Sequence, residues 1–219
     1  FIPNKEMKKF ITFEGGEGTG KSTQAKLLFS SIKKTSEKVI LTREPGGTNI
    51  AEEIRKIIVK NNYNLNKVSE LLLIYAARNE HLKDIIIPSL DKGHVILCDR
   101  FLDSTFVYQV QGKKIDTKIF EFFNKLIIKN YKPEVTFIID IDPIIGIERS
   151  LKLNKKETKY EKLPLSFHEK VRKDFITLSK KDERFKLIDG NKSIMEIHKE
   201  IIMTINEKKI METLKTTQM

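Results

Sequence analysis

The stretch "FITFEGGEGTGKST", residues 10–23, constrains the fold more than any other part of the chain. Phe10 to Glu14 read as a strand, and Gly15 to Ser22 match the pattern G-x-x-x-x-G-K-[ST] before a helical segment. In that position the loop directs backbone N–H groups and a lysine at phosphate groups. A simple glycine-rich turn would not require the strand before it and the helix after it. The stretch therefore predicts a loop that binds a nucleoside triphosphate.

Most residues of this loop have an expected task. Lys21 is expected to reach the outer phosphates, and the Ser22 hydroxyl is the expected Mg²⁺ ligand. Glu17 stands out, because a carboxylate repels phosphate groups at close range. Either it faces solvent or it serves another ligand. The residues expected at the phosphates of ATP are Gly15, Gly16, Gly18, Thr19, Gly20, Lys21, Ser22 and Thr23.

Apolar runs alternate with helical patterns along the whole chain. The run "HVILC" at 94–98 is continuous, as is typical of a parallel sheet covered on both faces. Strands are predicted at 10–14, 39–42, 94–98, 135–141 and 185–188. Helices are predicted at 21–32, 51–59, 68–90, 144–151, 165–180 and 194–206. This order predicts an α/β fold with a doubly wound, five-stranded parallel sheet flanked by helices, and ligands at the carboxyl ends of the strands.

The length of 219 residues suits one such domain. We expect it to span residues 8–208, with a polar, lysine-rich mobile lid at about 150–163. Residues 1–7 read as a flexible extension and residues 209–219 as a disordered tail. Because the chain shows no membrane span, no signal peptide and a single cysteine, Cys98, we expect a cytoplasmic protein with no membrane partner.

The net charge of +11 raises the alternative of a nucleic-acid-binding protein. Only seven of the 41 basic residues are arginine, and the lysines are spread over the whole chain. This distribution favours a solvated lysine-rich surface, so no specific nucleic-acid partner is expected. A regulatory GTPase is also disfavoured, because residues 154–157 and 191–194 only approximate its N-K-x-D motif.

Polar motifs follow the second and third predicted strands and interrupt the long helix. They are "TREPGGT" at 42–48, "DRFLDSTFVYQ" at 99–109 and "YAARNE" at 75–80. Each arginine in them could, taken alone, be a surface residue in a salt bridge. Together, Arg43, Arg78 and Arg100 indicate a second anionic ligand beside the triphosphate.

With the phosphate loop, these motifs resemble those of the thymidylate kinase family, in the same order and over about residues 8–206. The resemblance implies a P-loop kinase fold. It also implies transfer of the γ-phosphoryl group of ATP to dTMP with Mg²⁺, and a homodimer. A deoxynucleoside kinase is the alternative among enzymes, and its uncharged acceptor would need a general base. The phosphate of dTMP needs none, because catalysis then depends on position and charge.

The resemblance also implies the roles of individual residues. Arg100, flanked by Arg43, would grip the acceptor phosphate, while Arg78 would donate to a thymine carbonyl. Tyr108 would exclude a 2′-hydroxyl, and Glu17 would accept a hydrogen bond from the sugar 3′-hydroxyl. The implied substrate-binding residues are Glu17, Arg43, Glu44, Pro45, Ile74, Arg78, Arg100, Ser104, Thr105, Tyr108 and Gln109. The implied catalytic residues are Lys21, Asp99, Arg100 and Arg149, and the metal ligands are Ser22 and Asp99. Glu44-Pro45 could be cis or trans. The four histidines read as structural or surface residues.

One position and the lid depart from the family pattern. Ile74 stands where a phenylalanine usually stacks on thymine, and losing that stacking is worth roughly 0.5–1.5 kcal/mol. We therefore expect a weaker hold on the base. By the same resemblance, Gly18 would place the chain in the bacterial subclass without a basic residue in the phosphate loop, whose lid usually supplies arginines. No arginine lies between Arg149 and Arg172, so Arg149 and a lid lysine are expected to act instead.

Overall fold

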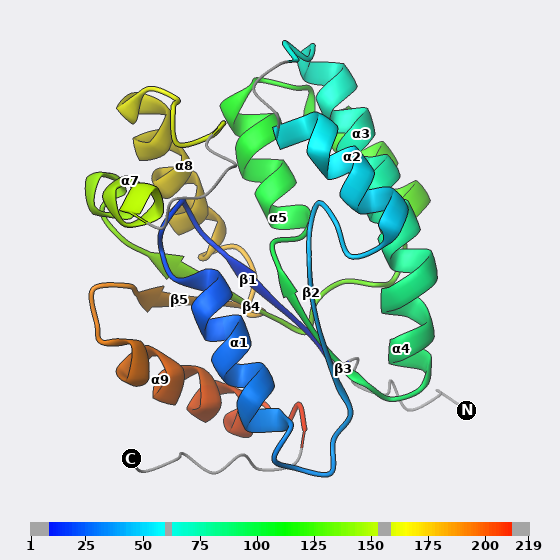
Figure 1. Ribbon diagram of the computed structural model, residues 1–219, viewed down its shortest axis with the longest axis vertical. Helices are drawn as coiled ribbons and strands as arrows, with labels where there is room; N and C mark the ends of the chain where they lie inside the picture. The colour runs from blue at the N-terminus through cyan, green and yellow to red at the C-terminus, as the bar shows by residue number, and fades with distance from the viewer. Residues whose placement is uncertain (1–8, 60–62, 153–158, 212–219) are drawn as a thin grey trace.

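The computed structural model describes residues 9–59, 63–152 and 159–211 (Figure 1). Within them the strands form one parallel sheet in the order β2-β3-β1-β4-β5. The strands are β1 (Phe10–Glu14), β2 (Val39–Arg43), β3 (Val95–Asp99), β4 (Val135–Asp140) and β5 (Phe185–Asp189). The predicted five-stranded sheet is thus confirmed, with each strand within one residue of its predicted bounds.

One face of the sheet is covered by α1 (Lys21–Ile32) and α9 (Ile194–Glu207), which lie side by side in Figure 1. Ile11 and Phe13, two residues apart on the central strand, pack in one core with Leu28 of α1 and Ile201 of α9. All four are fully buried. Burial of this apolar surface fixes the phosphate loop between β1 and α1 on a rigid base.

The opposite face carries a long helical segment that starts beside α2 (Asn49–Val59). It runs through α3 (Lys67–His81), a π-helical turn η1 (Leu82–Ile86) and α4 (Ile87–Asp91). Phe10 and Ile96 pack on this side with Leu71 and Tyr75 of α3. Tyr75 also donates to Asn124 Oδ1 over 2.8 Å, so its side chain belongs to the core and not to the ligand site.

The segment between β3 and β4 is helical, whereas the sequence predicts no element there. It contains α5 (Leu102–Thr105), η2 (Phe106–Gly112), α6 (Thr117–Phe123) and η3 (Asn124–Ile128). Two of these four pieces are π-helical, and a wider turn breaks the 3.6-residue period on which helix prediction rests. The remaining helices, α7 (Pro143–Lys152) and α8 (Leu165–Leu178), begin and end within two residues of the predicted bounds.

The end predicted for the domain, residue 208, is too early. Lys209 adopts a left-handed φ of 51°, and Ile210 N–H bonds to the carbonyl of Ile205. Ile210 and Met211 are buried in the same core as α1 and α9, because their apolar side chains complete it. The rest of the proposed tail, the N-terminal extension and residues 153–158 of the proposed lid lie outside the described residues. No helix among the described residues is long and apolar enough to cross a membrane.

Candidate active site

The phosphate loop wraps around the amino end of α1. The Lys21 side chain is buried beneath it, where Nζ donates to the Gly16 carbonyl oxygen and lies 3.3 Å from Thr19 Oγ1. Burial lowers the pKa of Lys21 from 10.5 to about 8. A lysine held inside the loop, at a helix N-terminus, is well placed to meet phosphate oxygens.

Ser22 and Asp99, the two predicted metal ligands, meet across the site. Ser22 Oγ donates to the Asp99 carboxylate, which ends β3 next to β1. Mg²⁺ is commonly bound through one or two protein oxygens, with phosphates and waters completing its shell. This donor set fits such an ion, although the described residues hold no group of three or more His, Cys, Asp or Glu side chains that could bind a metal.

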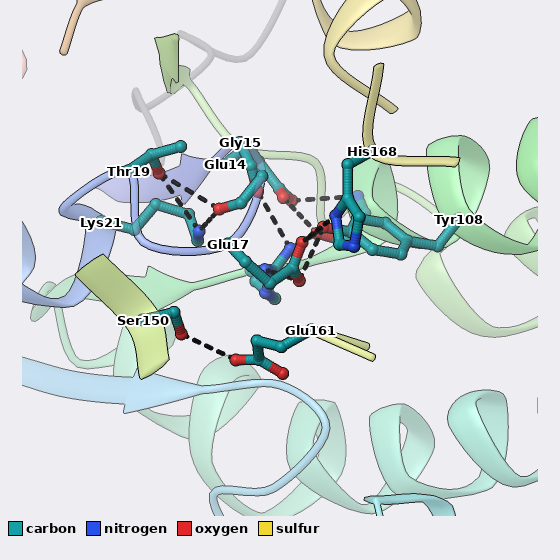
Figure 2. A network of polar contacts seen from close by, with 12 residues as sticks. Glu14, Gly15, Glu17, Thr19, Lys21, Tyr108, Ser150, Glu161 and His168 are labelled. Atoms are coloured by element: carbon teal, nitrogen blue, oxygen red, sulfur yellow. Dashed lines mark hydrogen bonds and ion pairs between the residues drawn. The ribbon is translucent and has the colours of Figure 1, made fainter. Parts of the chain in front are cut away.

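Glu17 lies among donors inside the site (Figure 2). Its carboxylate is 3.0 Å from Arg100 Nη2, accepts the Tyr108 hydroxyl at 2.8 Å, and lies 3.5 Å from His168 Nδ1. Burial alone would raise the pKa of Glu17, but His168, Arg100 and Lys21 lower it to about 2. The Glu17 side chain is only 7% exposed, so the solvent-facing alternative is wrong.

A buried carboxylate at the end of β1 holds the Arg100 loop in place. Glu14 accepts the Phe101 N–H over 2.8 Å and the Ser104 hydroxyl over 2.5 Å. Arg100, at a left-handed φ of 69°, donates to the Gly15 carbonyl over 3.1 Å and to Ser104 Oγ over 3.0 Å. The guanidinium of Arg100 is thereby directed back at the phosphate loop.

A second buried arginine, Arg78, lies further along the site. Its Nε donates to Glu44 over 2.6 Å and its Nη2 to Thr105 over 2.8 Å. His81 Nδ1 lies 3.0 Å from the other Glu44 oxygen, which supports the structural role expected for this histidine. Arg78 Nη1 is buried without a hydrogen-bond partner in the described part of the chain, and is therefore available to a ligand acceptor. The Glu44-Pro45 peptide bond is cis.

These side chains line one cavity of about 520 Å³, a volume that suits a nucleotide. It reaches from Lys21, Ser22 and Asp99 at the phosphate loop to Ile74 and Arg78 on α3. The cavity wall brings together every predicted substrate-binding residue, namely Glu17, Arg43, Glu44, Pro45, Ile74, Arg78, Arg100, Ser104, Thr105, Tyr108 and Gln109. Their individual roles toward a ligand stay predictions.

The family model of thymidylate kinase matches residues 13–201. The chain belongs to the thymidylate kinase family. It is 43% identical to the thymidylate kinase of Wolbachia pipientis wMel over 88% of this chain and 97% of that one. It is 41% identical to that of Sulfurihydrogenibium sp. (strain YO3AOP1), over 92% and 98%. The crystal structure of thymidylate kinase from Ehrlichia chaffeensis superposes with a TM-score of 0.74, at 36% identity over 90% of this chain and 97% of that chain.

As a thymidylate kinase, the chain is a nucleoside monophosphate kinase and a phosphotransferase. One predicted catalytic residue lies away from the acceptor cavity. Arg149, on α7, has its Nη1 3.4 Å from the Gly190 carbonyl oxygen and does not line the cavity wall. Lys159 of the lid does line it, next to Tyr160 and Glu161. The lid lysines 155 and 156 lie outside the described residues, so the expected partnership with Arg149 stays a prediction.

Sequence reasoning missed two buried groups at this thymidylate kinase site. His168 of α8 contacts Glu17, although it lies 151 residues further along the chain and belongs to none of the quoted motifs. Glu70 of α3 binds Gln109 and the lid residues Lys159 and Tyr160. For Glu70 a signal was present, because a carboxylate four positions before Ile74 falls on the same, buried side of the helix, where it needs a partner.

Proposed function

We propose that this thymidylate kinase transfers the γ-phosphoryl group of ATP to dTMP, giving dTDP and ADP, with Mg²⁺ as the metal. The observation that carries the proposal is that the phosphate loop and the acceptor residues share one cavity, joined by the Glu17–Arg100 ion pair. A site for two nucleotides needs such continuity, because the attacking phosphate must lie in line with the γ-phosphate.

At the phosphate end, the protein neutralises and positions charge. Lys21 serves the triphosphate, while Arg100 and Arg43 hold the acceptor phosphate between the two nucleotides. Mg²⁺, when bound by Ser22 and Asp99, would neutralise charge on the phosphates. The described residues provide these cations around one cavity, and the anionic acceptor needs no general base.

At the other end, the side chains suit a deoxyribosyl pyrimidine. The unpartnered Nη1 of Arg78 is a donor for a base carbonyl, and Ile74 provides an apolar wall. Tyr108 and Glu17, bonded to each other, occupy the sugar region between base and phosphate. Glu17 would accept the 3′-hydroxyl, and the Tyr108 ring would exclude a 2′-hydroxyl.

The loop position of Gly18 supports the bacterial subclass without a basic residue there. A Cβ at Gly18 would lie 1.8 Å from the Gly146 carbonyl oxygen, so no side chain fits while α7 keeps its place. The compensating cations would be Arg149 and one lysine of the proposed lid. Lys159 is one such lysine, and it lines the cavity.

We also place the enzyme in the cytoplasm as a homodimer. Support for the dimer comes from apolar side chains that are exposed on neighbouring helices, Val68 and Leu72 of α3 and Phe122 and Leu126 of the α6–η3 segment. Each pair is four residues apart and therefore lies on one helix face.

A coupled ADP-release assay with dTMP, dUMP, thymidine and dCMP tests the proposed function. We expect dTMP to be the preferred acceptor and thymidine to be inactive. Activity on thymidine without activity on dTMP would favour the deoxynucleoside kinase alternative. Absence of any acceptor-dependent ADP release, together with DNA binding that falls steeply with salt, would favour the nucleic-acid-binding alternative.

A further inference from the structure

Glu70 is a buried carboxylate that binds side chains from two other parts of the fold, the η2 segment with its C-cap and residues 159–160. It lies in the first turns of α3 and is 1% exposed. Gln109 Nε2 donates to Glu70 Oε1 over 2.9 Å, and Lys113 Nζ over 2.6 Å. Lys159 Nζ reaches Oε2 over 3.1 Å, and the Tyr160 hydroxyl reaches Oε1 over 3.3 Å. Such a concentration of donors on one anion indicates a task beyond filling the core.

The charge of Glu70 determines how the Gln109 amide is turned. Burial alone would raise the pKa of Glu70, but the bond and charge of Lys113 and the bond from Gln109 lower it, so the group is an anion at neutral pH. An ionised carboxylate only accepts hydrogen bonds. The amide nitrogen of Gln109 must therefore face Glu70, and its carbonyl oxygen must face the other way.

The carbonyl oxygen of Gln109 is free for a ligand. Gln109 lines the acceptor cavity, and among the described residues its side chain makes one hydrogen bond, through Nε2 and not through Oε1. Arg78, on the wall of the same cavity, offers the opposite group, the unpartnered donor Nη1. The base end of the cavity thus presents one fixed donor and one fixed acceptor.

This donor–acceptor pair matches only some pyrimidines. Thymine and uracil carry a carbonyl at C4 and an N–H at N3, which complement an arginine donor and an amide oxygen. Cytosine reverses both groups, with an amino group at C4 and an acceptor at N3. A site whose buried polar groups are left unpaired by an analogue rejects that analogue strongly.

We propose that Glu70 is a positioning residue for base specificity, which fixes the Gln109 amide so that its oxygen accepts the N3–H of an imide pyrimidine. The proposal rests on the proposed function, since it concerns the base of the acceptor nucleotide. With Glu70 neutral or withdrawn, the amide can turn over and offer its NH₂ group to N3 of cytosine.

The test compares kcat/KM for dTMP, dUMP and dCMP in the wild type and in Glu70→Gln, Glu70→Asp and Glu161→Gln. In Glu70→Gln we expect the dTMP:dCMP ratio to fall at least about tenfold, and the dTMP:dUMP ratio to stay within about twofold, because dUMP keeps the imide edge. Glu70→Asp keeps the charge but moves it away from Gln109 by one methylene, so the dTMP:dCMP ratio should fall to the same degree. This variant provides the test if Glu70→Gln does not fold. Glu161→Gln is the matched control, since it removes another carboxylate on the cavity wall, bonded to Ser150, and leaves the Glu70–Gln109 bond in place, so the dTMP:dCMP ratio should stay within about twofold of the wild type.

A double variant separates positioning from general structural support. If Glu70 acts through Gln109, then Glu70→Gln should not change the dTMP:dCMP ratio further in a Gln109→Leu background. Unchanged ratios in both Glu70 variants, or an equal loss with all three acceptors, would overturn the inference. A wild type without activity on dTMP would instead contradict the proposed function, so the two failures are distinguishable.

Discussion

The carboxylate of Glu17 lies between the phosphate loop and the acceptor residues, held by Arg100 and Tyr108. In Glu17→Gln the charge and its ion pair are lost, together with a strong acceptor for a sugar hydroxyl. A hydrogen bond to a charged group contributes about 1.5–3 kcal/mol, so KM for dTMP should rise at least about tenfold. KM for ATP should change less. Steady-state kinetics with each substrate varied in turn measures both constants.

Glu161→Gln is the matched control for Glu17→Gln. It removes another carboxylate on the cavity wall, one that accepts from Ser150 over 2.7 Å (Figure 2). In Glu161→Gln, KM for dTMP should not show the selective rise, relative to KM for ATP, that is expected for Glu17→Gln. A Glu17→Gln enzyme whose KM rises more for ATP than for dTMP would contradict the role given to Glu17.

The titration of Glu14 predicts how the free energy of unfolding depends on pH. Burial, with the charge of Asp103, raises the pKa of Glu14 from 4.5 to about 7. The folded state then binds this proton more tightly than the unfolded state. The Glu14 contribution to the free energy of unfolding is therefore largest below pH 4.5, falls as pH rises, and levels off above pH 7.

Glu14→Gln removes this titration. The stability of the variant relative to the wild type should thus increase, by up to about 3 kcal/mol, between acidic and neutral pH. Urea unfolding of both proteins, at pH values below 4.5 and above 7, measures the difference in the free energy of unfolding between them. A difference that is constant with pH, or that changes with the opposite sign, would show that Glu14 does not titrate in this way.

At the scale of elements, α7 lies directly against the phosphate loop. A Cβ at Gly146 would lie 2.4 Å from the Glu17 carbonyl oxygen. Helix propensity alone predicts that Gly146→Ala stabilises the protein by about 1 kcal/mol. Because the methyl group has no room, we expect lower stability and a raised KM for ATP instead. Thermal unfolding and ATP kinetics check both, with Glu148→Ala, at an exposed position of the same helix, as the control. A more stable Gly146→Ala enzyme with unchanged KM for ATP would contradict this contact.

The elements that could be predicted from the sequence are those in which the pattern of apolar residues stays the same from end to end. Buried strands such as Val95–Asp99 are continuous apolar runs, and α9 begins at a capping box that starts with Ser193. The segment after β3 could not be predicted, because η2 and η3 interrupt the α-helical period. Ile210 and Met211 were missed for another reason. Their burial depends on packing into the core shared by the sheet, α1 and α9, which local sequence does not reveal.

At the scale of the whole molecule, the order of the strands assembles the site. β1 pairs with β3, so Arg100 meets Glu17 although the two lie 83 residues apart in the chain. The motifs predicted that polar residues would follow strand ends, and the resemblance predicted which of them face a second ligand. Neither supplied His168 or Glu70, because tertiary packing brings α8 and α3 to the cavity.

We propose that one continuous cavity brings ATP and dTMP together for transfer of the phosphoryl group. Incubating the protein with dTMP, Mg²⁺ and ATP labelled on its γ-phosphate, and separating the nucleotides, follows that group directly. We expect label in dTDP, in equal amount to the ADP formed, and no label on thymidine in a parallel reaction. Label found only in inorganic phosphate, or on thymidine but not on dTMP, would contradict it.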